Sequence, residues 1–294
     1  MDQSMADRPG ATALPRTSPL VSGLVYPECP RWRNDALYIS DQHGGIVYRI
    51  AADGSRTVVL ELPAEPGGLG WDPDGNLMVV AMRDRTLLRV RDGVTESVAQ
   101  LGAFHPGLSN ELLVDGVGRS YVGNIGFDFY HGEEPRTTCL VLVDVDGTVT
   151  VAADDLLVPN GMVLTAGGRR LVVAESFAHR LTGFAVAADG TLGERTVFAD
   201  LGESVPDGIC LDREGAIWFA AIGEHEVKRV LPGGEITDRI STGDAEAIAC
   251  TLGGPDLTTL YVCTSGTFDP TRTVVERSGA IETATVRVPG AGSP

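Results

Sequence analysis

Basic residues, long apolar runs and helix-period patterns are all scarce in this chain. Its 294 residues contain 23 Lys and Arg against 40 Asp and Glu, which gives a formal net charge of -17. Nucleic acids and anionic membranes bind clusters of Lys and Arg, which release the counterions of the phosphates. The charge balance therefore predicts a protein with neither a nucleic-acid partner nor a membrane partner.

Neither a membrane span nor a secretory signal is visible. No window reaches the roughly 18–20 consecutive apolar residues of a transmembrane helix. The first 19 residues lack the apolar centre of a signal peptide. We therefore expect residues 1–19 to form a disordered leader and the protein to be cytoplasmic.

Cysteine and histidine are too few and too scattered for a thiolate or imidazole metal site. The five cysteines include no CxxC pair, and the five histidines show no HxxxH pattern. A GxSxG elbow is absent as well, which argues against a serine esterase. We expect buried free thiols at Cys29, Cys139, Cys210, Cys250 and Cys263.

Turn residues, in contrast, are abundant, with 37 Gly and 17 Pro. Asp-Gly and Gly-Gly pairs recur from Asp53-Gly54 to Gly253-Gly254, and such pairs supply the positive φ angles that tight hairpins need. Between them lie short runs rich in β-branched and aromatic residues, such as residues 36–40 and 217–220. This pattern predicts an all-β protein.

Six of these short strands align as an internal repeat. The equivalent position near the start of each strand is occupied by Glu28, Gly67, Asn110, Asn160, Asp207 and Ala247. Successive positions are 39 to 50 residues apart, the length of a four-stranded propeller blade. The repeat therefore predicts a six-bladed β-propeller with four-stranded antiparallel blades, which spans residues 20–294.

The ring of blades must close, because an open first or last blade would expose strand edges. The last unit supplies strands near residues 247–252, 260–264 and 281–288. We therefore expect the N-terminal strand at residues 20–26 to close the last blade as its outermost strand, and residues 289–294 to form a tail.

The innermost strands of a propeller run in one direction, so their equivalent starting residues meet at one mouth of the channel. Here the set contains two carboxylates and two amides, with no His or Cys. Oxygen ligands suit a hard divalent ion, Ca²⁺ first and then Mg²⁺ or Mn²⁺. Asn160-Gly161 and Asp207-Gly208 could each be a simple turn, whereas Glu28 is a poor turn former. The combination points to a site for one divalent metal ion.

The same residues resemble the senescence marker protein, gluconolactonase and luciferin-regenerating enzyme family. The similar motifs are Glu28-Cys29-Pro30-Arg31-Trp32, Asn110-Glu111-Leu112, Pro159-Asn160-Gly161 and Pro206-Asp207-Gly208. The resemblance implies a six-bladed propeller with one divalent ion held by Glu28, Asn160 and Asp207. It also implies that Asn110 contacts substrate or completes the ligand set. Family members mostly hydrolyse lactones, and some relatives cleave phosphoesters or phosphofluoridates.

One position departs from the family pattern. Sugar-lactone members commonly have an Arg two residues before the Asn that matches Asn110, whereas this chain has Leu108. A polyhydroxylated sugar lactone is therefore less strongly indicated than a lactone in general.

Further pocket residues are expected where the second strand of each blade ends. We predict substrate contacts for Asn124 and Glu175. Other candidates for the pocket wall are Asp41, His43, Arg83, Phe127, Phe177, His179 and Thr264.

These features predict a metal-dependent hydrolase of carboxylic ester bonds that opens a small lactone. The ion polarises the carbonyl, and Asp207 activates water as the general base. The alternatives are a metal-dependent cyclase or condensing enzyme, a phosphoesterase, and a non-catalytic propeller scaffold. We expect a monomer or a weak homodimer.

Overall fold

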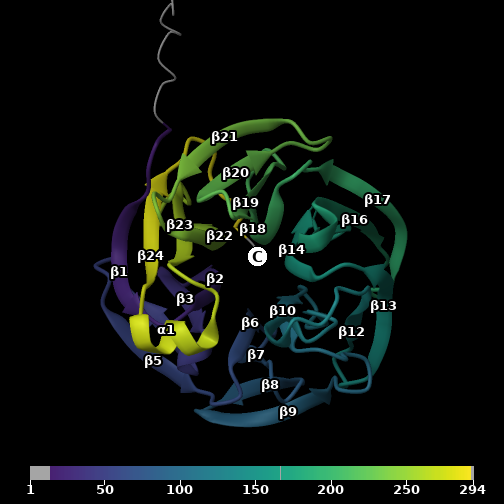
Figure 1. Cartoon of the computed structure of the whole chain (residues 1–294). Coiled ribbons are helices and arrows are strands. Elements are labelled where there is room, and N and C mark those ends of the chain that lie inside the picture. The colour runs from purple at the N-terminus through teal and green to yellow at the C-terminus, as the bar shows by residue number, and fades with distance from the viewer. Residues whose placement is uncertain (1–13, 166, 293–294) are drawn as a thin grey trace, which may run out of the picture.

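The computed structural model describes residues 14–165 and 167–292. In this part of the chain, 24 strands form six four-stranded antiparallel sheets. Figure 1 looks down the ring, with the six sheets arranged as blades around a central axis. The predicted all-β fold, a six-bladed β-propeller, is therefore confirmed.

Five of the six blades contain four strands in sequence order from the axis outwards, and in the last blade the N-terminal strand is outermost. The innermost strands are β2 (Pro27–Arg33), β6 (Pro66–Trp71), β10 (Ser109–Val114), β14 (Pro159–Thr165), β18 (Val205–Leu211) and β22 (Glu246–Gly253). The second strands are β3 (Ala36–Asp41), β7 (Leu77–Ala81), β11 (Ser120–Asn124), β15 (Arg170–Glu175), β19 (Ile217–Ile222) and β23 (Thr259–Ser265). The third strands are β4 (Ile46–Ile50), β8 (Thr86–Arg91), β12 (Thr138–Val143), β16 (Arg180–Val186), β20 (Glu226–Val230) and β24 (Gly279–Thr285). The outermost strands are β5 (Arg56–Glu61), β9 (Val94–Gln100), β13 (Val149–Leu156), β17 (Leu192–Asp200), β21 (Ile236–Ser241) and β1 (Ser18–Leu24).

The last blade is closed by the N-terminal strand, as predicted. β1 pairs antiparallel with β24, and Val21 lies opposite Ile281. The strand begins at Ser18, and before it the backbones of Pro15 and Thr17 hydrogen-bond to Ser241. Residues 1–13 of the predicted leader lie outside the described residues. The ring therefore closes non-covalently, through strand pairing within one sheet.

Close contact between neighbouring innermost strands depends on glycine. A Cβ atom at Gly161 would lie 2.7 Å from the carbonyl oxygen of Asp207, and one at Gly208 would lie 2.3 Å from the Cβ of Ala249. Both glycines lie within strands rather than in turns. The glycine after each of these polar residues therefore allows adjacent blades to approach, and the turn interpretation of Asn160-Gly161 and Asp207-Gly208 is wrong.

The apolar core lies between the blades. One cluster joins Val163 and Val172 of the fourth blade to Leu211 and Phe219 of the fifth. Corresponding clusters fill the other blade interfaces. Each blade therefore depends on its neighbours to bury its faces, as expected for a radial repeat. All five cysteines are free, as predicted, and four of them are buried, whereas Cys139 is only half-buried.

The segment expected as a tail is hydrogen-bonded to the propeller. Pro289 accepts a hydrogen bond from the backbone N–H of Arg213, Gly290 donates to Leu257, and Ala291 donates to Leu211. The C-terminal segment therefore joins the fifth and sixth blades at the end of the channel where the innermost strands finish.

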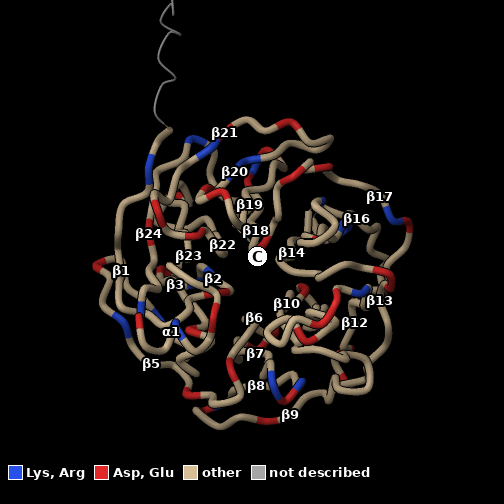
Figure 2. The backbone as a smooth tube through the Cα atoms, in the orientation of Figure 1, with Lys and Arg blue, Asp and Glu red and all other residues tan. Residues whose placement is uncertain are grey.

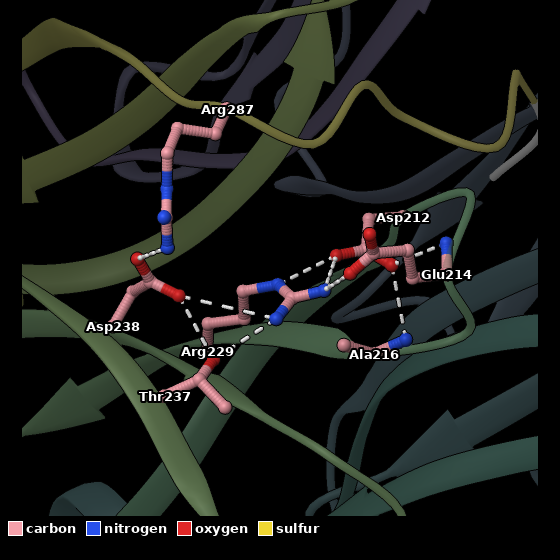
Figure 3. A network of polar contacts seen from close by, with 7 residues as sticks. All are labelled: Asp212, Glu214, Ala216, Arg229, Thr237, Asp238 and Arg287. Carbon is pink, nitrogen blue, oxygen red and sulfur yellow. Dashed lines mark hydrogen bonds and ion pairs between the residues drawn. The ribbon is translucent and has the colours of Figure 1, made fainter.

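Acidic side chains outnumber basic ones around the ring. Asp and Glu are spread over all blades, with fewer Lys and Arg among them (Figure 2). The main buried ion pair of the fifth blade joins Arg229 to Asp212 at 2.7 Å, with Glu214, Thr237 and Asp238 beside it (Figure 3). This network connects three strands of one blade and lies away from the residues predicted to bind metal.

Candidate metal and substrate site

The four predicted polar residues line one cavity. Glu28, Asn110, Asn160 and Asp207 lie near the starts of β2, β10, β14 and β18, and all four contribute to the wall of a cavity of about 170 Å³. Their exposed fractions are 5 to 8%. Residues from four separate blades therefore meet in a buried space at one mouth of the channel.

A β-bulge lies at or directly after each of these positions. In the first blade Glu28 lies opposite Ser40, but the next paired residue is Arg31, opposite Tyr38. The same shift lies between Pro159 and Met162 and between Pro206 and Ile209. A bulge bends a strand and re-aims its side chains. The bulges therefore explain how polar side chains at the start of an otherwise core-forming strand reach the channel mouth.

Burial and mutual repulsion make the two carboxyls hard to ionise without a cation. Burial raises the pKa of Asp207 to about 8, and the nearby Glu111 carboxylate adds to the shift. Burial, Asp207 and Glu111 together raise the pKa of Glu28 well above its usual value. Buried acids of this kind retain protons unless a positive charge replaces them.

Unpaired oxygen atoms also point to a cation. Asn160 Oδ1 and Asp207 Oδ1 are buried without a hydrogen-bond partner among the described residues. An unpaired buried polar atom is costly. Two carboxylates and two amide oxygens form a donor set suited to Ca²⁺, Mg²⁺ or Mn²⁺. The residues present therefore fit the divalent ion that the sequence predicts.

Two charged residues near Glu28 were not singled out from the sequence. Arg31 and Glu111 are buried and form an ion pair at 2.9 Å. Arg31 also donates hydrogen bonds to the carbonyl oxygens of Leu69 and Leu112. Ligand atoms of Glu28, Cys29 and Glu111 lie within 4.8 Å of one another. The signal in the sequence was a charged residue in the interior of two innermost strands, Arg31 in PECPRWR and Glu111 in SNELLV.

Asn124 and Glu175, predicted as substrate contacts, have hydrogen-bond partners within their own blades. Asn124 accepts a hydrogen bond from Thr138 at 2.8 Å and donates one to the carbonyl of Cys139 at 2.8 Å. Glu175 accepts hydrogen bonds from Arg180 and from the backbone N–H of Leu157. Neither belongs to the cavity wall, although the next residues, Ile125 and Ser176, do.

Of the other candidates for the pocket wall, Phe177 lines the cavity, and Arg83 and Phe127 line an adjacent groove. Asp41 does not line the cavity. Its carboxylate instead accepts hydrogen bonds from the backbone N–H groups of Val25 and Tyr26. Asp41 in the first blade and Glu175 in the fourth thus have the same role, since each carboxylate accepts a backbone N–H from the segment that precedes the innermost strand.

Two long connections cover the mouth of the cavity, and we call them together the lid. They are residues 125–137, between β11 and β12, and residues 266–278, between β23 and β24. The second contains the only α-helix in the described chain, α1 (Pro270–Glu276), which lies over the first blade in Figure 1. Aromatic residues of both segments, Phe129, Tyr130 and Phe268, form part of the cavity wall.

His43 connects the two lid segments. Its Nδ1 lies 2.8 Å from Thr273 Oγ1, its Nε2 lies 3.3 Å from the Tyr130 hydroxyl, and its ring stacks on Tyr26 at 4.5 Å. Burial lowers the pKa of His43 to about 4, with a smaller contribution from Arg83. The imidazole is therefore neutral near pH 7, with one nitrogen donating and the other accepting.

The fold and the cavity define a class of protein, the six-bladed β-propeller with a buried, oxygen-rich cavity at one mouth of its channel. Comparison with known families makes the assignment specific. The model for the SMP-30/Gluconolactonase/LRE-like region matches residues 26–266. The chain belongs to this family, and the predicted resemblance is confirmed.

Curated relatives include enzymes that act on lactones. The chain is 27% identical over 279 residues to 6-deoxy-6-sulfogluconolactonase of Pseudomonas putida, which covers 92% of this chain and 94% of the relative. It is 29% identical over 247 residues to a pentonolactonase of Haloferax volcanii, which covers 81% of each. Lactonases hydrolyse a carboxylic ester bond, so these names agree with the predicted enzyme class.

Solved structures show the same fold. The calcium-binding protein regucalcin of Agrobacterium tumefaciens superposes with a TM-score of 0.81 at 23% identity, over 97% of this chain and 98% of the other. A luciferin-regenerating enzyme superposes with a TM-score of 0.81 at 16% identity, over 95% of this chain and 98% of the other. Within the described residues, no helix is long and apolar enough to cross a membrane.

Proposed function

We propose that this protein is a divalent-metal-dependent lactonase whose site is the cavity lined by Glu28, Asn110, Asn160 and Asp207. The observation that carries the proposal is the pair of buried oxygens, Asn160 Oδ1 and Asp207 Oδ1, that lack partners beside a second carboxylate. Lactonases among the curated relatives support the reaction type.

Glu28, Asn160 and Asp207 would hold the ion, with Ca²⁺ as the first candidate and Mg²⁺, Mn²⁺ or Zn²⁺ as alternatives. Two carboxylates balance the charge of one divalent ion. When bound, the ion supplies Lewis-acid polarisation of the lactone carbonyl. Asn110 supplies an amide at the same cavity, where it contacts substrate or completes the ligand set.

Asp207 is the proposed general base. Its carboxylate takes a proton from water as the water oxygen bonds to the carbonyl carbon. The bond between that carbon and the ring oxygen then breaks, and Asp207 returns the proton to the ring oxygen. The product is the open hydroxy acid.

Asn124 and Glu175 were predicted to contact substrate, and we propose a supporting role for them. Each is the last residue of a second strand, and each is followed directly by a residue of the cavity wall. Their hydrogen bonds hold the ends of β11 and β15, which positions Ile125 and Ser176 against the substrate.

Metal analysis combined with lactone hydrolysis tests the proposal. We expect one divalent ion per chain, loss of hydrolysis after chelation, and recovery on adding Ca²⁺, Mg²⁺, Mn²⁺ or Zn²⁺. Asp207→Ala and Glu28→Gln should each lower kcat/KM by at least about 100-fold, whereas Asp146→Asn, in an exposed turn, should leave it unchanged. Full turnover in chelated protein would remove the metal from the chemistry.

The alternative functions are distinguished in the same assays. Phosphotriester cleavage without lactone hydrolysis would favour the phosphoesterase. Formation of a condensed or cyclised product without hydrolysis would favour the biosynthetic enzyme. Absence of both metal and turnover would favour the scaffold.

A further inference from the structure

Apart from its four polar residues, the cavity has an apolar wall. Met82, Val158, Val205 and Ile222 form its sides, and Phe129, Tyr130, Phe177 and Phe268 supply aromatic surface. Gln42, Ser176 and the tyrosine hydroxyls are the further polar groups in the described wall. One end of the cavity is therefore rich in oxygen donors and acceptors, and the remainder is hydrocarbon.

Basic side chains that could bind sugar hydroxyls are missing from the described part of this wall. Among the described residues that form it, none is Lys, Arg or His. Arg83 lies in the adjacent groove, where it pairs with Glu65 at 2.6 Å. Leu108 packs against the apolar cluster of Met78 and Leu112. The hydroxyls of a polyhydroxylated ring that face the apolar side chains of the wall would lose hydrogen bonds to water, which is costly.

The size of the cavity adds a second constraint. Its volume of about 170 Å³ is smaller than the roughly 300–1,000 Å³ of pockets for drug-sized ligands. The part of a substrate that enters this cavity must therefore be compact, with its reactive carbonyl near Glu28 and Asp207 and its remaining bulk beneath the aromatic side chains of the lid.

We infer that the substrate is a small lactone with an alkyl or aryl substituent on the ring, and not a polyhydroxylated sugar lactone. This inference rests on the proposed function and specifies its substrate class. The aromatic residues of the lid, Phe268 above all, select the substituent by enclosing it away from water.

A substrate series measures this selectivity. With metal-loaded protein, kcat/KM for γ-alkyl-γ-butyrolactones should rise about 4-fold for each added methylene until the cavity is filled. An aldonolactone of the same ring size should be at least about 100-fold poorer than the best alkyl lactone. Binding of alkyl-substituted and hydroxylated γ-lactams, measured by calorimetry, should follow the same order without requiring turnover.

A variant pair separates selection by the lid from general damage. Phe268→Ala should lower kcat/KM for the best alkyl lactone about 10-fold, while the unsubstituted γ-butyrolactone changes less than about 3-fold. Val275→Ala is the matched control, because Val275 lies in the same lid segment and is 80% exposed. Its kinetics should match wild type for both substrates.

The outcomes distinguish this inference from the proposed function. Faster turnover of the aldonolactone than of every alkyl lactone would overturn the inference while leaving the lactonase intact. Hydrolysis of no lactone by metal-loaded protein would overturn the proposed function. In that case the lactam measurements decide the inference, and tighter binding of the hydroxylated lactam would reject it.

Discussion

Glu28 and Asp207 combine deep burial with mutual repulsion, so protons and a metal ion compete for the same oxygens. Burial raises the pKa of Asp207 to about 8, and burial and Asp207 raise that of Glu28. A carboxylate must lose its proton to bind a metal, and binding therefore releases protons. The pH at which the site loads follows from these two residues.

We therefore expect apparent metal affinity to rise as pH increases from about 5 to about 8, by up to about 10-fold for each proton released per pH unit. In chelated protein, stability changes with pH in the opposite direction and falls as pH rises. The pKa of Asp207 is higher in the folded state than in the unfolded state, so its contribution is lost as pH rises from about 4 to about 8. Calorimetric titrations with Ca²⁺, and thermal unfolding with and without chelator, measure the two effects. A metal affinity independent of pH would contradict the assignment of these carboxylates as ligands.

His43 gives a second dependence on pH, through stability. Its pKa is about 4 in the folded protein and about 6.5 in model compounds, because burial disfavours the imidazolium. Below about pH 6.5 the imidazole of His43 binds a proton in the unfolded chain, whereas in the folded chain it stays neutral down to about pH 4. Stability contributed by neutral His43 is therefore lost as pH falls through this range.

Between pH 7 and pH 5, wild type should lose about 1–2 kcal/mol more unfolding free energy than the variant His43→Gln, because glutamine does not titrate in this range. Thermal unfolding from pH 7 to pH 4.5 provides the measurement. His131→Gln is the control, since His131 has a side chain that is 84% exposed. Equal pH slopes for wild type and His43→Gln would show that His43 does not contribute.

At the scale of elements, the turn after an innermost strand is held by a recurring carboxylate. Asp72, Asp115 and Asp212 each accept the backbone N–H four residues later, at 2.8 to 3.0 Å. An Arg pairs with each carboxylate. The first hairpin of these blades is therefore fixed at the channel end opposite the cavity, which leaves the cavity end free to carry polar ligands.

Arg229 is the most enclosed of these arginines, and Figure 3 shows its guanidinium between Asp212, Glu214 and Thr237. The side chains of Arg229 and Asp212 are 7% and 0% exposed. Arg229→Met would leave Asp212 buried without its counterion, at a cost of about 3 kcal/mol in unfolding free energy. Urea unfolding measures this loss.

The matched variant for that experiment is Arg239→Met. Arg239 pairs with Glu226 at 2.7 Å on the same blade, but its side chain is 47% exposed. An exposed pair contributes at most about 1 kcal/mol. Equal destabilisation by the two substitutions would contradict the role given to the buried pair.

At the scale of the whole molecule, closure of the ring depends on β1. Leu24 is fully buried and Val21 nearly so, and both belong to the core cluster between the first and last blades. Deleting residues 1–24 would expose β24 as an edge and open this cluster. We expect the midpoint of thermal unfolding to fall by more than about 10 °C, with aggregation on heating.

A shorter deletion is the control for removing N-terminal residues other than those of β1. Removing residues 1–13 leaves β1 and the hydrogen bonds of Pro15 and Thr17 to Ser241 in place. Thermal unfolding of this protein should match that of the full chain. Similar destabilisation by both deletions would assign the stabilising role to the leader instead of β1.

We propose that the protein is a monomer or a weak homodimer, from the apolar residues and charges of its outer surface. Exposed apolar residues of the outermost strands are divided among separate blades, with Val58 on β5, Val94 on β9 and Val197 on β17. Stable interfaces need a contiguous apolar centre. Surface charge is also dominated by acidic residues, so copies of this chain repel one another.

Local chemistry and spacing determined much of this protein from the sequence alone. A repeat of 39 to 50 residues with glycine-rich turns predicts the blades, because each hairpin needs neighbours to bury its faces. The same periodicity predicts that Glu28, Asn110, Asn160 and Asp207 meet in one cavity. The resemblance to the family added that this chain has Leu108 where sugar-lactone members commonly have Arg, which weakened the case for a sugar lactone.

Only the tertiary structure decided which other residues reach that cavity. Asn124 and Glu175 end their strands in the expected places, but local hydrogen bonds turn their side chains into the blades. Arg31 and Glu111 come together from strands of different blades. The lid is likewise built from two segments far apart in the chain, since Phe129 and Phe268 become neighbours of one cavity only once the ring has closed. The repeat in the sequence predicts where each strand lies in the ring. The direction of a side chain depends in addition on its hydrogen-bond and packing partners, which come from other parts of the chain.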